Sequence, residues 1–163
     1  SGAYPIIAVD LLDSKLEAAK RFGATHTVRA DQDSAEEAVL EITGGRGADY
    51  AFITVGSTAA LEQGLKMIGK QGTEVLVGIP ETGANYSLPE GGFVGSEKKM
   101  MGRMMGSTRL GYYIPKHVAA YQEGKLKLDE LITNRYPLEK INEAIESMEG
   151  GEALRNIITF GDG

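Results

Sequence analysis

The carboxylate of Asp10 lies at the end of a predicted strand, a position from which it could bind a sugar. Asp10 directly follows the apolar run Ile6–Val9, which predicts a short strand, and a helical pattern begins a few residues later. A carboxylate at the end of such a strand can accept two hydrogen bonds from ribose hydroxyls, and its charge would repel a 2′-phosphate. Only nine residues precede Asp10, whereas the glycine-rich phosphate loop of dinucleotide-binding folds lies about 20 residues before this acid.

A helix cap is the competing interpretation of Asp10. Asp10 itself, Asp13, or Ser14 with Glu17 as a capping box could satisfy the free amides of the first helical turn. Because Ser14 and Glu17 already supply a cap, Asp10 is less needed for that purpose. On the residues alone, ribose binding and helix capping both stay open.

Two glycines, Gly56 and Gly78, each follow an apolar run that predicts a buried strand. Open α/β sheets bind ligands at the carboxyl ends of their strands, and a glycine there lets a backbone approach a ligand closely. The competing interpretation is a tight turn that needs a positive φ. The corresponding positions of the two glycines favour the ligand.

The other candidate functional residues are three arginines, two glycine clusters and four methionines. Arg103, Arg109 and Arg155 could pair with phosphate groups, although a surface arginine is usually only solvated. The glycine clusters at 44–47 and 91–95 are predicted to be turns, because neither follows a strand and opens a helix. Four methionines are interpreted as core or interface residues: Met100, Met101, Met104 and Met105.

No metal ligand and no catalytic residue is predicted within these 163 residues. The sequence has no cysteine, and its two histidines, His26 and His117, have no second ligand at a metal-binding spacing. The patterns G-x-G-x-x-G, G-x-x-x-x-G-K-[ST], H-E-x-x-H and G-x-S-x-G are also absent from the sequence.

The composition restricts the partners. With a formal net charge of −6, the chain is not expected to bind nucleic acid, because such binding depends on basic side chains that contact phosphates. No run approaches the ~20 apolar residues of a membrane span, and the start lacks the pattern of a signal peptide. The absence of cysteine favours the cytoplasm.

Predicted strands and helices alternate along the first half of the chain. The second helix begins with a Ser34–Glu37 capping box, and the third places Leu61, Leu65 and Ile68 on one face. The run 48–56 is predicted to be buried on both faces of a parallel sheet. The predicted strands here are 6–9, 26–31, 48–56 and 73–80, and the predicted helices follow the first three of them.

The second half is less regular. The glycine-rich stretch 83–96 is predicted to be a loop rather than a helix, and 98–107 a possible further strand. A helix is predicted over 114–125, ending at Gly124. A last helix begins at Pro137, with Leu138, Ile141, Ile145 and Met148 on one side, and a strand over 154–160 follows. This order predicts an α/β fold with a doubly wound parallel sheet, Rossmann-like and lacking its N-terminal strand.

From about residue 6 to 160 the sequence resembles the zinc-dependent medium-chain alcohol dehydrogenases. The resemblance rests on four stretches, of which the last is the most specific: IIAVDLLDSKLEAAKRFGAT, GADYAFITVGST, GTEVLVGIP and YPLEKINEAIESMEGGEALRNIITF. It implies that residues 1–163 are the NAD-binding portion of such an enzyme, including the tail helix and strand. It also implies hydride transfer between a small alcohol or carbonyl compound and NAD.

The resemblance assigns roles to residues at the expected cofactor edge. It implies that Asp10 binds the adenosine ribose with Lys15 beside it. Arg103 to Met105 would meet the carboxamide through main-chain groups, and Arg155 would reach the pyrophosphate. The residues that would flank the adenine, the nicotinamide ribose and the nicotinamide are Thr54, Val55, Gly56, Val77, Gly78 and Ile79.

In that family the first strand, its glycine-rich turn and the zinc ligands lie upstream of the portion that resembles this chain. We therefore expect a portion of a longer enzyme, inactive alone, in which zinc belongs to the absent catalytic domain. The missing strand is central in the order 3-2-1-4-5-6, so its absence would either split the sheet or make strand 6–9 pair with the strand around 49–55.

Three other functions stay open. A zinc-free, NADPH-dependent quinone or enone reductase of the same superfamily is the main alternative, and Asp10 argues against it. The others are a noncatalytic Rossmann-like module and a methyltransferase, which also uses an acid after its second strand. We further expect a homodimer through the last sheet strand at 98–107, whose edge would be unpaired and rich in methionine.

Overall fold

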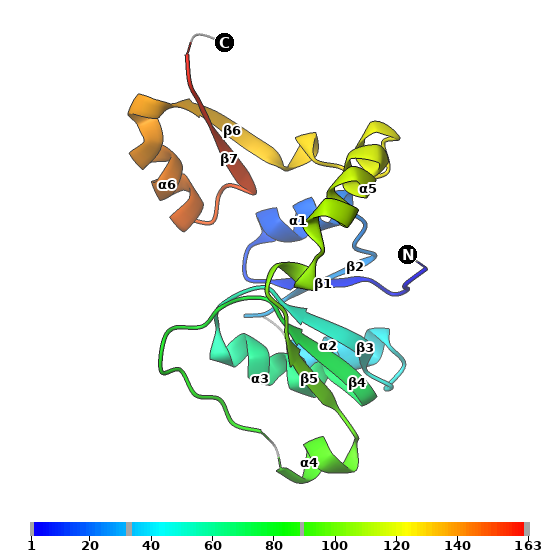
Figure 1. Ribbon diagram of the computed structural model, residues 1–163. Helices are drawn as coiled ribbons and strands as arrows, with labels where there is room; N and C mark the ends of the chain where they lie inside the picture. The colour runs from blue at the N-terminus through cyan, green and yellow to red at the C-terminus, as the bar shows by residue number, and fades with distance from the viewer. Residues whose placement is uncertain (1, 32–33, 89, 162–163) are drawn as a thin grey trace. The chain divides into compact units, whose positions relative to one another are not determined.

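The computed structural model describes residues 2–31, 34–88 and 90–161 (Figure 1). The chain forms two compact units. The first comprises Ser1–Leu11 and Ala19–Thr108, and the second comprises Leu12–Ala18 and Arg109–Gly163. The division falls inside helix α1 (Asp13–Arg21).

The first unit begins with a pair of parallel strands, β1 (Ile7–Asp10) and β2 (His26–Arg29). Asp10 is the last residue of β1 and lies opposite Arg29 in the register. Helix α2 (Ala35–Ile42) follows β2, and the Ser34 hydroxyl accepts a hydrogen bond from Glu37 N at 3.3 Å. This N-terminal cap confirms the predicted start of the second helix.

A second sheet of the same unit holds three parallel strands in the order β3-β4-β5. The strands are β3 (Ala48–Ile53), β4 (Ile68–Leu76) and β5 (Lys99–Gly102). Helix α3 (Thr58–Met67) connects β3 to β4, and a short helix, α4 (Glu90–Gly95), precedes β5. Figure 1 shows β3 in turquoise and β4 and β5 in green, with α3 lying along them.

Within the described residues, β1 pairs with β2 and β3 pairs with β4, so the two sheets are separate. Of the two outcomes expected for a missing central strand, the split sheet is the one observed. The prediction that 48–56 is buried on both faces is wrong. α3 covers the face of β3 that carries Ala51 and Ile53, whereas Tyr50 and Phe52 on the other face are 63% and 65% exposed.

Two apolar clusters hold the first unit together. One joins Val28 of β2 to Val39 of α2 and to Met67 at the end of α3. The other joins Leu61, Leu65 and Ile68, as the helical spacing predicted, although Ile68 is already the first residue of β4. Burial of such apolar side chains is the main favourable contribution to folding.

Some boundaries in the first unit differ from prediction. β4 begins at Ile68 rather than at residue 73, because Ile68 already pairs with Ala48 of β3 before a bulge shifts the register. The stretch 83–96 is not all loop, and 91–95 is not a turn, because Phe93 of α4 packs onto the cluster around Leu65 and stabilises the helix. The turn predicted at 44–47 is confirmed by positive φ at Gly44, Gly45 and Gly47.

The cap assigned to Ser14 is also wrong. α1 begins at Asp13, and the amides of Lys15 and Leu16 both donate to Leu12 O, so residue 12 is the cap position and Ser14 lies inside the helix. Asp10 lies two residues before that position. The structure therefore overturns Ser14 as the cap and leaves the role of Asp10 a prediction.

The second unit contains α5 (Leu110–Gln122), the parallel strands β6 (Ile132–Pro137) and β7 (Arg155–Thr159), and α6 (Ile141–Glu149). Strand β6 was not predicted. Pro137 ends β6 and does not begin a helix, because residues 138–140 form a single 3-10 turn before α6. α5 begins four residues before the predicted start and ends before Gly124, which has a φ of 68°.

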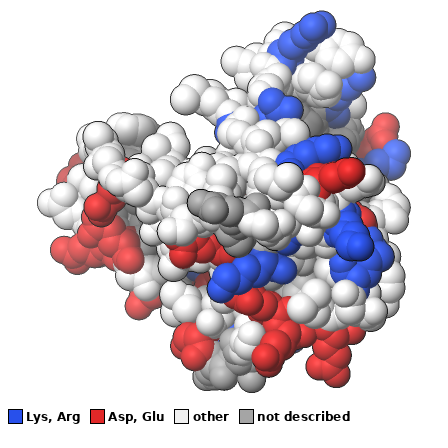
Figure 2. All heavy atoms as spheres, turned by 90° about the horizontal axis from the view of Figure 1, so that it is seen from below, with Lys and Arg blue, Asp and Glu red and all other residues white. Residues whose placement is uncertain are grey.

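None of the helices in the described part of the chain is long and apolar enough to cross a membrane. On the face drawn in Figure 2, Lys and Arg side chains are interspersed with Asp and Glu side chains. This mixture is typical of a solvated surface.

Candidate functional site

The loops that follow β3 and β4 touch each other through their backbones. A Cβ on Gly78 would stand 2.8 Å from Val55 N and closer still to the Val55 carbonyl group. A Cβ on Gly56 would stand 3.0 Å from Ile79 C and closer still to Ile79 O. Glycine is therefore required at both positions because each loop occupies the space that a side chain on the other would need.

This contact corrects one interpretation of the two glycines. Neither Gly56 nor Gly78 has a positive φ, so the tight-turn interpretation is wrong. The reason for glycine is the approach of backbone to backbone. The contact brings six of the predicted cofactor-binding residues into one place, namely Thr54, Val55, Gly56, Val77, Gly78 and Ile79.

Hydrogen bonds fix the same edge of the sheet. The amides of Val77 and Gly78 both donate to Ile53 O at 2.9 Å, so β4 leaves the sheet while still bound to the end of β3. The hydroxyl of Ser57 caps α3 by accepting from Ala60 N at 3.3 Å. Together these bonds place two loop backbones and the start of a helix at the carboxyl end of β3.

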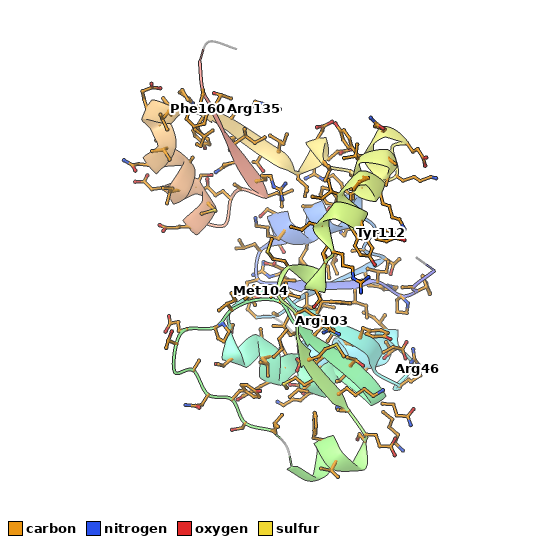
Figure 3. All side chains as sticks on the ribbon, viewed as in Figure 1. Arg46, Arg103, Met104, Tyr112, Arg135 and Phe160 are labelled. Carbon is orange, nitrogen blue, oxygen red and sulfur yellow. The ribbon has the colours of Figure 1, made fainter. Side chains whose placement is uncertain are left out.

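The end of β5 extends this edge. Arg103 N donates to Leu76 O at 2.9 Å, and Arg103 and Met104, labelled in Figure 3, follow the last residue of β5. Met105, Gly106 and Ser107 all have positive φ, between 48° and 67°. For Met105 and Ser107 this left-handed backbone is unfavourable, so the turn is locally strained. The predicted site residues Arg103 and Met105 thus flank or occupy an unusual turn at the strand end.

The side chain of Arg29, opposite Asp10 in the register, is bound by a carboxylate. Arg29 Nε donates to Asp31 Oδ1 at 2.8 Å, and Arg29 Nη2 donates to Asp31 Oδ2 at 2.7 Å. The hydrogen bond from Arg29 lowers the pKa of Asp31. This two-point geometry is the one that guanidinium groups adopt with carboxylates and phosphates. Asp10 is half-buried at the end of β1 beside this pair.

The remaining two predicted residues, Lys15 and Arg155, lie in the second unit. Lys15 Nζ donates to Ala153 O, two residues before Arg155. Arg155 is exposed and is the first residue of β7. Lys15 therefore holds the turn that leads to Arg155, and the roles of both residues toward a cofactor stay predictions.

One acid of the first unit was not predicted from the sequence. Glu74 lies inside the apolar strand β4 and is fully buried. Burial raises its pKa to about 7, while the charge of Lys98 acts in the opposite direction. The sequence signal was a single glutamate within TEVLVGIP, a stretch that is otherwise apolar and is predicted to be a buried strand. A charged side chain is costly in such a strand.

The described residues do not fit a zinc ion. They contain no group of three or more His, Asp or Glu side chains that could hold a metal ion, and the sequence has no cysteine. Zinc sites in proteins use three or four such ligands. By contrast, a carboxylate at the end of β1 and converging backbone groups at the ends of β3 and β4 fit a dinucleotide.

Comparison with known proteins identifies the family. The family model for zinc-binding dehydrogenases matches residues 1–120. This chain belongs to the zinc-binding dehydrogenase family, as the resemblance in its sequence indicated.

Two curated relatives are similar to this chain over nearly its whole length. An NDMA-dependent alcohol dehydrogenase of Amycolatopsis methanolica is 39% identical over 97% of this chain and 43% of its own length. An alcohol dehydrogenase of Malus domestica is 35% identical over 97% of this chain and 42% of its own length. The chain thus spans less than half the length of these relatives.

The solved structure of benzyl alcohol dehydrogenase from Acinetobacter calcoaceticus superposes with a TM-score of 0.93 at 34% identity, covering 98% of this chain and 44% of the other. A zinc-binding domain protein of alcohol dehydrogenase type from Burkholderia ambifaria gives the same TM-score and identity, covering 99% of this chain and 43% of the other. These likenesses confirm the Rossmann-like α/β fold with parallel strands.

Proposed function

We propose that this chain is the NAD-binding portion of an alcohol dehydrogenase that moves hydride between a small alcohol or carbonyl compound and NAD. The observation that carries the proposal is the backbone contact between the loops after β3 and β4, at the strand ends where α/β sheets bind nucleotides. Membership of the zinc-binding dehydrogenase family and relatives named as alcohol dehydrogenases support it.

In this proposal each part of the edge binds one part of the cofactor. Asp10 accepts hydrogen bonds from the adenosine ribose. The loop of Thr54, Val55 and Gly56 flanks the adenine and the nicotinamide ribose, while Val77, Gly78 and Ile79 present backbone groups to the nicotinamide. When bound, NAD accepts the hydride.

The two loops contribute rigidity as well as contacts. Because Gly56 and Gly78 fix the loops against each other, their backbone groups are positioned before a ligand arrives. Such preorganisation reduces the entropy lost on binding. Main-chain groups around Arg103 to Met105 would meet the carboxamide. Arg155 would reach the pyrophosphate, and Lys15 supports the turn before it.

The pair of Arg29 and Asp31 favours NAD over NADP. An arginine near the ribose acid can bind a 2′-phosphate, but Asp31 occupies the guanidinium of Arg29 at two points. Asp10 adds repulsion toward the same phosphate. This argues against the alternative, an NADPH-dependent quinone or enone reductase of the same superfamily.

The proposal assigns no step to zinc in this chain, since its described residues do not fit the ion. Zinc would belong to a part of the enzyme outside these residues. The choice of alcohol depends on that part as well. The cytoplasm is the proposed location, because a chain without cysteine suits a reducing compartment.

We also propose a homodimer through the outer edge of β5. Of the described strands, β4 is the one that pairs with β5, and Met104 and Met105 beyond its end are 77% and 78% exposed. An edge of this kind can pair with the same edge of a second copy. The proposed partners are thus a second copy and a small substrate.

Calorimetric titration of the full-length protein that carries this chain tests the function directly. NAD, NADP and S-adenosylmethionine are titrated in parallel at one salt concentration. The proposal expects NAD to bind more tightly than NADP and S-adenosylmethionine not to bind. Binding of S-adenosylmethionine alone would support a methyltransferase, and no binding of any of the three would support a noncatalytic module.

A further inference from the structure

The carboxyl group of Glu74 is enclosed by apolar surroundings. Glu74 is 0% exposed, and its register partners are Ala51 on β3 and Met100 on β5. Ala51 and Met100 both pack against the apolar cluster of α3, so Glu74 points to the helix-covered face. Neither of its carboxylate oxygens has a hydrogen-bond partner within the described residues. A buried carboxyl without partners is strongly biased toward its neutral form.

Gly64 makes the space for this carboxyl. A Cβ on Gly64 would stand 2.6 Å from Ile53 Cδ1 and closer still to Glu74 Oε1. Gly64 lies in the interior of α3, where glycine is less stabilising than alanine. The glycine is therefore explained by the side chain of Glu74, which reaches the surface of the helix at this point.

Lys98 is the cation whose charge acts on Glu74. It lies on the segment that leads into β5, and burial lowers its pKa while Glu74 raises it. In the structure Lys98 Nζ donates to Leu65 O at 2.6 Å. Leu65 is the residue after Gly64, in the last turn of α3, where carbonyl groups lack partners within the helix. Lys98 therefore binds the C-terminal end of α3, one residue after Gly64, the residue that Glu74 Oε1 faces.

The other charged groups on the surrounding elements are bound elsewhere or exposed. On α3, Glu62 accepts from Ser87 N at 2.9 Å, and Lys66 forms an ion pair with Glu36 at 2.9 Å. The charged residues on β3, β4 and β5 other than Glu74 are exposed, and they are Asp49, Lys70 and Lys99. The tyrosine of β3, Tyr50, is also exposed. Among the described residues, Lys98 is thus the charged group available to Glu74.

We propose that Glu74 and Lys98 form a proton-controlled latch at the C-terminal end of α3. While Glu74 is protonated, the ammonium group of Lys98 binds Leu65 O, as observed. When Glu74 loses its proton to solvent, the ammonium group moves from Leu65 O to the Glu74 carboxylate, and the last turn of α3 loses this bond. The latch needs no cofactor, so it stands whether or not the proposed function is correct.

The pH range of the latch follows from the environment of Glu74. Burial raises the pKa of Glu74 from 4.5 to about 7 in the folded chain. The folded state then holds a proton that the unfolded state releases, so the free energy of unfolding falls as the pH rises from 4.5 to about 7 and levels off above that range. The latch is closed on Leu65 below about pH 7.

Carbon-13 NMR of the Glu74 carboxyl tests the proposal in the full-length protein, with Glu74→Gln used to assign the signal. We expect a titration midpoint of about 7, and a higher midpoint in Lys98→Met, which removes the opposing cation. Glu97→Gln is the matched control, because Glu97 neighbours Lys98 but is exposed and bound to Gln71; it should leave the midpoint unchanged. A midpoint in the ordinary range of glutamate would overturn the latch.

Hydrogen exchange of the amides at the end of α3 and thermal unfolding supply the second readout. In the wild type, exchange corrected for its intrinsic pH dependence should become faster above about pH 7, and the unfolding temperature should fall between pH 5 and 7. Both changes should be lost in Glu74→Gln, which keeps the shape of the side chain without its charge. If the wild type and Glu74→Gln show the same pH dependence in both measurements, the proposal is wrong.

Discussion

Gly78 lies against the backbone of Val55 so closely that no side chain fits between them. This contact makes a sharp prediction for Gly78→Ala. The methyl group would push the loops after β3 and β4 apart, at a cost of about 1–3 kcal/mol in unfolding free energy, as for other overpacked sites. Both loops lie at the carboxyl ends of the strands, where we propose that NAD binds. The variant should therefore also lose affinity for NAD.

Gly91→Ala is the matched control for that change. A Cβ on Gly91 would meet nothing within 4 Å, so this variant should keep both stability and affinity for NAD. Thermal unfolding and calorimetric titration of the two variants measure the two effects. Equal affinity for NAD in Gly78→Ala and the wild type would show that the loop contact does not position a cofactor.

The pair of Arg29 and Asp31 predicts a change in cofactor preference. Asp31→Asn removes the carboxylate charge that binds Arg29 at two points, and the guanidinium should then attract a 2′-phosphate more strongly. The full-length protein carrying Asp31→Asn should bind NADP more tightly, with little change for NAD. The control is Asp49→Asn, which removes the exposed ion pair between Arg46 and Asp49 at the start of β3. It should change the affinity for neither NAD nor NADP.

The same pair predicts a dependence on pH. Arg29 lowers the pKa of Asp31 below its ordinary 3.8. A lowered pKa in the folded state means that the stabilisation from the pair is present above pH 3.8 and is lost as the pH falls through the lowered value. The stabilisation that the pair gives to the folded state should therefore stay constant from neutral pH down to about pH 5, measured as the difference in unfolding free energy between the wild type and Asp31→Asn. A fall in that difference already at pH 6 would contradict the role given to the pair.

The proposed dimer is tested by Met104→Lys. A lysine beyond the end of β5 would place a charge at the edge that we expect to pair with a second copy. The dimer should therefore be weaker and should dissociate at a higher protein concentration than the wild-type dimer. Analytical ultracentrifugation of the full-length protein measures this change. Lys70→Met, an exposed change on the neighbouring strand β4, serves as the control. An unaltered dimer affinity in Met104→Lys would exclude this edge as the interface.

Much of the first unit could be predicted because its strands are short apolar runs that end in distinctive residues. Asp10 and the glycines after β3 and β4 mark strand ends, and their positions are confirmed. The reason for Gly56 and Gly78 could not be predicted, because the contact joins residues of two separate loops and depends on the sheet that brings them together.

Other elements could not be predicted for identifiable reasons. β6 has the polar sequence ITNRYP and ends at a proline that is equally typical of a helix start. α4 contains three glycines and forms because Phe93 packs into the core, a tertiary effect that outweighs local propensity. Glu74 is a charged residue type within an otherwise apolar strand. Its burial could not be predicted, because it depends on the space that Gly64 of α3 leaves for its side chain.

The most direct test of the account is the cofactor preference of Asp10→Gly in the full-length protein, with Asp13→Asn as the control on the neighbouring acid. Asp10→Gly removes the proposed ribose acceptor and the charge that repels a 2′-phosphate. The Michaelis constant for NAD should rise, that for NADP should fall, and Asp13→Asn should resemble the wild type. An unchanged preference between NAD and NADP in Asp10→Gly would contradict the assignment of Asp10 and, with it, the proposed NAD edge.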